Sequence, residues 1–219
     1  MSLLYYSRMR LTTNLLPLLL ASSLPAHIVS VFGPGRDTTF IPADLSLRDP
    51  KNYSFMTSGS HAAYFTTFFM EHLAAQHPGR LSLIHYYPGL VFTSSFSDPK
   101  LPAWFRWIFN YGRPLFNYLP MTRSPEESGN RIVFNTSSRF PARPADDKPW
   151  SSKTDDGLEI ATSSDGLLGG GAYRVNYDSE IIKTGNQYPK LREEGWQEKI
   201  INHTLEAFEE IKAGRAFTG

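Results

Sequence analysis

Residues 81–89 read LSLIHYYPG, and this stretch decides the fold that we expect the chain to adopt. A short, mostly apolar run without helical spacing is typical of a strand buried on both faces, and the proline and glycine after it stop the strand. A second run, HIVSVF at 27–32, has the same character and is closed by GPG at 33–35. The two runs therefore predict two buried strands of one sheet.

Helical periodicity precedes each of the two predicted strands. Over residues 3–20, leucines recur at spacings of three, four and seven, which predicts a helix with one buried face: Leu4, Leu11, Leu15, Leu18 and Leu19. Over residues 57–75, a second apolar stripe predicts another helix: Phe65, Phe68, Phe69 and Leu73. Helix, strand, helix and strand with short connections is the order of βαβ units. We therefore expect an α/β fold with a doubly wound parallel sheet.

The rest of the chain adds to this sheet and contains two excursions. Residues 169–177 offer a third strand, a helix is expected to begin at Ser124, and the tail is expected to be helical over 190–212. Residues 94–125 are an insertion rich in aromatic residues and proline. Residues 141–166 have the proline, serine and aspartate content of a loop.

The composition is that of one globular domain, 1–219, and it argues against several classes of protein. Hydrophobic residues make up 41% of the chain, which excludes wholesale disorder. Lys and Arg number 22 and Asp and Glu 21, so a net charge of +1 argues against binding to nucleic acid through bulk electrostatics. The absence of cysteine excludes disulfides and cysteine-based zinc sites. His72 and His77 point apart on a helix, so no metal site is expected.

The apolar run near the first residue has two interpretations. Arginines followed by LLPLLLASSLPA at 15–26 resemble a secretory signal peptide, and N-x-S/T sequons at Asn52, Asn135 and Asn202 agree with export. The run is too short for a transmembrane helix, which needs about 20 apolar residues. We favour a core helix, because the strand and helix pattern that follows needs one there. The sequence then predicts a cytoplasmic protein without a membrane span.

The run PGLVFT at 88–93, which follows the strand at 81–87, is a candidate to bind a ligand. In an open parallel sheet, ligands bind beyond the carboxyl ends of the strands. The backbone N–H and C=O groups here and the Thr93 hydroxyl could therefore form hydrogen bonds with a carboxamide group. A plain turn that ends the strand is the alternative, since Pro-Gly pairs commonly mark turns.

Several segments together resemble the short-chain dehydrogenase/reductase family, and within it a group of fungal enzymes found among secondary-metabolite genes. They follow the family's order and spacing: residues 6–10, 15–19, 27–31, 52–54, 61–63, 88–93, 196 and 203–204. The resemblance implies NAD or NADP as cofactor, with its carboxamide held by Pro88, Gly89, Val91 and Thr93. It also implies a homodimer formed through helices 3–20 and 57–75, and a lid over the substrate at 94–125.

The sequence departs from the family where phosphate binding and catalysis reside. The family begins with a strand and a glycine-rich turn that holds the pyrophosphate, and no such segment precedes the first predicted helix. The GPG turn at 33–35 lacks a third glycine and a following helix, so we interpret it as a plain turn. Thr57 stands where the family has its catalytic Tyr, and His61 where it has the Lys. We therefore expect an incomplete Rossmann-like fold that lacks the N-terminal, dinucleotide-binding half.

Two residues are candidates to replace the missing Tyr-Lys pair. His61 has a reference pKa near 6.5 and can transfer a proton at neutral pH, and Tyr53 precedes it in the chain. Each also has a structural interpretation. His61 can be a helix residue bonded to nearby backbone, and Tyr53 can be a loop aromatic residue that packs on the core.

The resemblance thus implies an NAD(P)-linked oxidoreductase that acts on a carbonyl or alcohol group of a hydrophobic small molecule. A first alternative is a cofactor-free homologue that serves as a binding or scaffold protein, or as a non-redox catalyst. A second is a fragment of a longer gene product.

Overall fold

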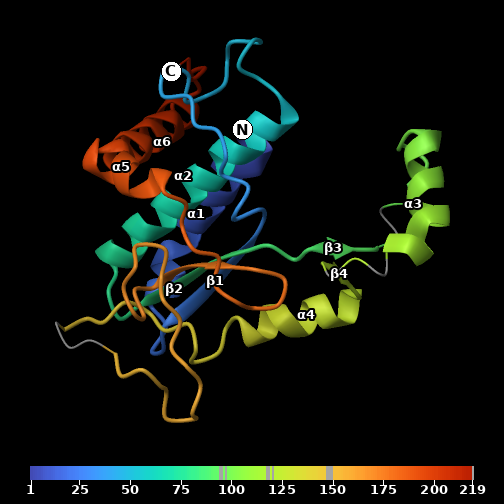
Figure 1. Ribbon diagram of the computed structural model, residues 1–219. Helices are drawn as coiled ribbons and strands as arrows, with labels where there is room; N and C mark the ends of the chain where they lie inside the picture. Colours follow the sequence, from blue (N-terminus) through green and yellow to red (C-terminus); the bar gives the residue numbers. More distant parts are fainter. Residues whose placement is uncertain (94–95, 97, 117–118, 120, 147–149, 219) are drawn as a thin grey trace.

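The computed structural model describes the chain except for residues 94–95, 97, 117–118, 120, 147–149 and 219. Its centre is a parallel sheet in the order β1-β2-β5, formed by Ala26–Val31, Leu81–Tyr86 and Ala172–Val175 (Figure 1). All six residues of β2 are buried, as expected for the strand between two neighbours. The α/β class and the parallel sheet predicted from the sequence are confirmed, and the arrangement is consistent with an incomplete Rossmann-like fold.

Two helices cover one face of the sheet, and a third lies against them (Figure 1). These are α1 (Ser7–Leu20), α2 (Phe55–Gln76) and α6 (Trp196–Lys212). Helix α2 begins two residues before the predicted start, because the Ser54 hydroxyl caps it by accepting a hydrogen bond from the Thr57 N–H at 3.0 Å. The predicted stripe of α2, including Phe65, is buried in the main core.

The prediction for the buried face of α1 is wrong in part. Leu11, Leu15 and Leu18 are exposed, whereas Tyr5 and Met9 are buried against α2 and α6. Leucines occur on several sides of α1, so periodicity located the helix but not the side that docks. Tyr5 lies in a π-helical turn, η1 (Ser2–Tyr6), that leads into α1.

The start of the chain is tied to α6 by two hydrogen bonds between side chains. The Tyr5 hydroxyl lies 2.9 Å from the Thr204 hydroxyl, and the Tyr6 hydroxyl lies 2.7 Å from Nε2 of His203. Burial lowers the pKa of His203 to about 4, so the ring is neutral at pH 7 and can accept from Tyr6. These contacts join segments almost the full length of the chain apart.

The other face of the sheet is covered by α4 (Pro125–Phe134) and by irregular chain that follows it. Ser124 caps α4 by accepting a hydrogen bond from the Glu127 N–H, as predicted. Phe140 is the buried centre of this second core and packs edge-on against Tyr173 of β5. The described residues of 141–166 contain no helix and only isolated bridges.

An arm leaves the sheet after β2 and returns at α4. It consists of β3 (Leu90–Val91), α3 (Ala103–Phe116) and β4 (Thr122–Arg123), and β3 pairs with β4. Figure 1 shows α3 standing away from the helices that cover the sheet. The arm occupies most of the insertion recognised at 94–125.

The tail differs from the single helix predicted for 190–212. It forms α5 (Gln187–Glu193) and then α6, with Gly195 between them at a φ of +72°. A residue in the left-handed region ends a helix, and glycine adopts that region without strain. No helix in the described part of the chain is long and apolar enough to cross a membrane.

Candidate functional site

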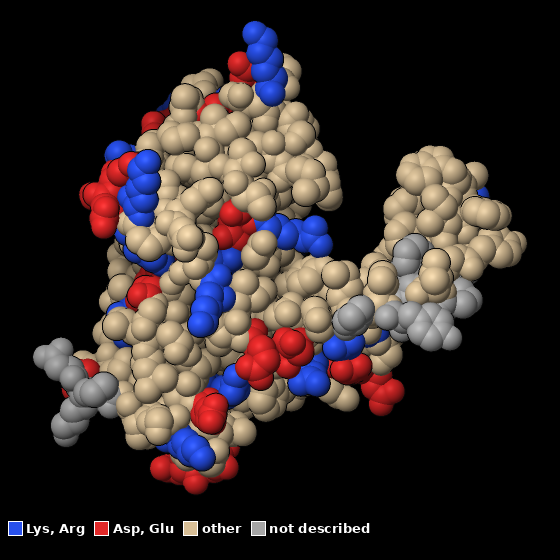
Figure 2. Space-filling model, viewed as in Figure 1, with Lys and Arg blue, Asp and Glu red and all other residues tan. Residues whose placement is uncertain are grey.

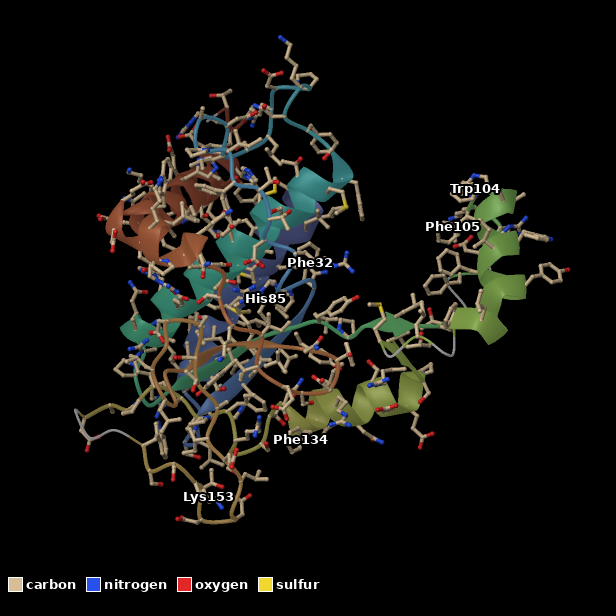
Figure 3. All side chains as sticks on the ribbon, viewed as in Figure 1. Phe32, His85, Trp104, Phe105, Phe134 and Lys153 are labelled. Atoms are coloured by element: carbon tan, nitrogen blue, oxygen red, sulfur yellow. The ribbon has the colours of Figure 1, made fainter. Side chains whose placement is uncertain are left out.

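The carboxyl ends of the three strands form the edge where a ligand is expected. Phe32, directly after β1, and His85 of β2 stack there, with ring centroids 6.2 Å apart and planes within 4° (Figure 3). The Arg8 guanidinium of α1 lies 5.5 Å from the centroid of the Phe32 ring. The edge therefore combines aromatic surface with a cation.

A buried ion pair crosses this edge. Arg174 of β5 donates to the carboxylate of Asp37 at 2.6 Å, and the two side chains are only 2% and 5% exposed. The loop after β1 is thereby tied to the far strand of the sheet. The Gly35 N–H also donates to Asp37, at 2.9 Å, so the GPG segment is a turn that positions this carboxylate. No helix follows it until α2, which agrees with the plain turn expected from the sequence.

Tyr64 of α2 forms hydrogen bonds that hold the same loop in place. Its hydroxyl donates to the backbone oxygen of Asp37 at 3.0 Å and lies 2.6 Å from Oε1 of Gln187. Burial, with a further contribution from the Asp37 carboxylate, raises the pKa of Tyr64 to about 12. The hydroxyl therefore stays protonated and acts as a donor at physiological pH.

His85 is a buried titratable residue without a hydrogen bond. Neither ring nitrogen has a partner among the residues that the structure describes. Burial holds its pKa well below the usual value, and the positive charges of Arg174 and Arg8 lower it further. The ring is consequently neutral, which suits its stacking on Phe32.

The four predicted ligand-binding residues begin the arm. Gly89 has a φ of +74°, and a Cβ there would overlap the carbonyl oxygen of Met121. That oxygen accepts the Leu90 N–H at 2.9 Å, so the turn is closed against the return strand of the arm. Val91 pairs with Arg123 within the arm, and Thr93 is exposed beyond it. Pro88 and Gly89 thus follow the carboxyl end of β2, whereas Val91 and Thr93 lie in the arm that leads away from it.

His61 lies away from solvent, under the loop that follows β1. It is fully buried, and its Nε2 accepts a hydrogen bond from the Ile41 N–H at 2.9 Å. The Phe40 ring lies 5.4 Å from it, centroid to centroid. Burial lowers the pKa of His61, and the Leu45 backbone and the Asp44 carboxylate partly oppose this shift. The ring holds the loop onto α2.

Tyr53 occupies a different environment from His61. Its side chain is 59% exposed and lies just before the cap of α2. One of the two candidate catalytic residues is therefore closed to solvent and the other open to it. Their proposed roles in proton transfer stay predictions.

We expect His61→Leu to lower the melting temperature, because the variant leaves the buried Ile41 N–H without an acceptor. The expected loss is about 1–3 kcal/mol, and about 2–4 °C in melting temperature for each kcal/mol. His61→Gln keeps an acceptor oxygen and should lose less. If both variants melt like the parent in scanning calorimetry, the ring does not hold the loop.

The sequence did not single out the pair of Asp37 and Arg174. The available signal was an arginine inside the strand AYRV, where a charged side chain is buried only with a partner. Nothing local identifies that partner, which lies 137 residues earlier. No cluster of metal-binding side chains occurs in the described parts of the chain.

Comparison with known proteins gives relatives over nearly the whole chain, although no family model matches. The short-chain dehydrogenase/reductase SAT2 of Stachybotrys chartarum is 35% identical over 96% of this chain and 58% of its own length. Oxidoreductase AN1596 of Emericella nidulans is 36% identical over 91% of this chain and 58% of its own. Oxidoreductase andH of Emericella variicolor is 31% identical over 94% of this chain and 59% of its own length.

The chain thus spans somewhat more than half the length of these curated relatives. Over nearly its whole length the chain is similar to one fungal short-chain dehydrogenase/reductase and to two fungal oxidoreductases.

Proposed function

We propose that the protein acts as an NAD(P)-linked oxidoreductase on a carbonyl or alcohol group of a hydrophobic small molecule in fungal secondary metabolism. One observation carries this proposal. The Pro-Gly turn leaves the carboxyl end of β2, the central strand of a parallel sheet, where open α/β folds bind their ligands. The relatives are named as a short-chain dehydrogenase/reductase and as oxidoreductases, which supports the same class of reaction.

The residues at this edge fit the nicotinamide end of the cofactor. Gly89 turns the chain out of the sheet, and Thr93 presents an exposed side chain after it. Pro88, Gly89, Val91 and Thr93 would hold the carboxamide, and the bound cofactor would accept or supply a hydride. No strand of the described chain leads through a glycine-rich turn into a helix, so these residues offer no matching site for the pyrophosphate.

The proposal has little support for His61 as the proton donor. The ring is buried and already accepts a hydrogen bond from the Ile41 N–H. Tyr53 is exposed in the loop that precedes α2. The structure favours Gly89 and its neighbours as the functional part of the site over either residue.

We expect the protein to bind NADPH saturably in a fluorescence titration, and Gly89→Ala to weaken binding on the order of tenfold, equivalent to about 1.4 kcal/mol. The added Cβ would overlap Met121 and displace the turn. Gly157→Ala is a matched control, because Gly157 also has a positive φ, +83°, but faces open space. If the two variants bind NADPH equally, the Pro-Gly turn is not part of the cofactor site.

The same titration addresses the cofactor-free alternative. A folded protein that shows no saturation at millimolar NADPH contradicts the oxidoreductase proposal and favours a binding or scaffold role. This alternative is supported by one observation: the described residues offer no site for the pyrophosphate of the cofactor. Folding is checked by far-ultraviolet circular dichroism of the same sample.

Two further expectations remain proposals. The exposed face of α1 (Leu11, Leu15 and Leu18) supports a homodimer through this helix, whereas α2 is mostly buried within its own chain. Residues 94–125, six of which lie outside the described structure, are proposed to cover the substrate. In the structure α3 stands apart from the carboxyl edge, so covering it requires the arm to move (Figure 1).

A further inference from the structure

Helix α3 carries an apolar stripe that points away from its own packing partners. The side chains recur at spacings of three, four and seven, which places them on one side of the helix: Trp104, Trp107, Ile108, Tyr111 and Leu115. Each is between 40% and 73% exposed. Figure 2 shows the visible surface of α3 as mostly uncharged, in contrast to the mixed charges over α4.

The opposite side of α3 is already occupied. Phe105 and Phe109 pack on each other at 4.4 Å between centroids, and Phe109 lies 4.9 Å from Phe96. Phe96 in turn contacts Phe92 at the base of the arm. The arm therefore has its own small core, and the exposed stripe is not part of that core.

The arm is positively charged overall, although Asp98 lies within it. Residues 90–123 contain four basic residues (Lys100, Arg106, Arg113 and Arg123) and one acidic residue (Asp98), although the whole chain is almost neutral. Arg123 is paired with Glu127 of α4, and the other three basic residues keep the arm positive. A second copy of this arm would repel it, whereas an anionic surface would attract it.

We infer that the α3 arm docks onto the interface of an anionic lipid bilayer, with the stripe in the boundary between headgroups and acyl chains. A helix with aromatic and aliphatic residues on one side, and basic residues elsewhere, lies in this boundary without crossing it. Trp and Tyr favour this depth because each has an apolar ring and a polar tip. The fourteen residues of α3 are too few to span a bilayer.

This placement goes beyond the oxidoreductase proposal and does not depend on it. The arm leaves the body at Gly89 and returns at Met121, so a docked arm holds the carboxyl edge of the sheet near the lipid. A hydrophobic substrate dissolved in the bilayer would then be close to the site.

The test is co-sedimentation of the full chain with vesicles of phosphatidylcholine alone and of phosphatidylcholine mixed with phosphatidylserine. We expect binding to the mixed vesicles, weaker binding to the neutral ones, and a loss when salt rises from about 0.1 M to about 1 M. Tryptophan emission should shift to shorter wavelength on binding. Absence of binding to the mixed vesicles overturns the inference.

Trp107→Glu places a charge in the stripe and should weaken vesicle binding on the order of tenfold or more. Val133→Glu on α4 is the matched control, because Val133 is 71% exposed but lies outside the arm, and it should bind like the parent. Melting temperatures of both variants show that they fold. Vesicle binding that Trp107→Glu leaves unchanged overturns the inference.

The mass measured by light scattering in the absence of lipid shows whether a second copy of the chain, rather than lipid, covers the stripe. A parent dimer that Trp107→Glu converts to a monomer would assign the stripe to a second copy and contradict lipid docking. An unchanged mass together with lost vesicle binding supports it. NADPH titration of Trp107→Glu should match the parent, so failure of lipid docking and failure of the oxidoreductase proposal are distinguishable.

Discussion

Replacing Asp37 with alanine is expected to lower the free energy of unfolding by about 3–5 kcal/mol, the usual cost of removing one partner of a buried ion pair. The substitution leaves the Arg174 guanidinium buried at the carboxyl edge without its carboxylate. It also releases the Gly35 N–H from its acceptor. Urea denaturation at neutral pH measures the loss.

Glu180→Ala is the matched control for this prediction. It removes the pair of Glu180 with Arg139, whose atoms are 2.8 Å apart but whose carboxylate side chain is 68% exposed. Water screens such a pair, so the expected loss is below about 1 kcal/mol. Equal losses in Asp37→Ala and Glu180→Ala would contradict a special contribution from burial. The double variant Asp37→Leu with Arg174→Met should recover much of the loss, because no charge is then left buried.

Phe65→Ala is expected to cost about 3–5 kcal/mol through the cavity it leaves in the main core. The Phe65 ring meets Tyr5 edge-on at 5.2 Å and His203 at 6.1 Å between centroids, and it also lies 5.9 Å from His61. It thereby joins η1, α2 and α6. Rings held by three elements cannot collapse into the space, which places the expected loss near the upper end of the range.

Phe55→Ala serves as the control on the same helix. Phe55 is the first residue of α2 and is exposed, so its removal should change the free energy of unfolding by less than about 1 kcal/mol. Thermal melts of the two variants should differ by on the order of 10 °C, from about 2–4 °C for each kcal/mol. Indistinguishable melts would show that Phe65 is not central to the core.

The sequence predicts the elements of the core well because each is specified by neighbouring residues. The run at 81–87 gave a strand buried on both faces, and Ser124 marked the start of α4. The break at Gly195 could not be predicted, since an isolated glycine within a helical pattern is often tolerated.

The candidate site is less predictable than the fold. The position of Gly89 at the carboxyl edge followed from the order of strands, but its closure against Met121 depends on where the arm returns. His61 was placed on the correct helix, yet its burial is caused by the loop that folds over it. Its possible role in proton transfer was therefore not decidable from spacing.

The sequence by itself determined the α/β class, the parallel order and the Pro-Gly turn, because periodicity and turn chemistry are properties of a few adjacent residues. Only the tertiary structure decided which side of α1 is buried, that Asp37 pairs with Arg174, and that the aromatic side of α3 faces outward. These outcomes depend on contacts between residues far apart in the chain. Such contacts form when whole elements dock, and no local pattern encodes their partner.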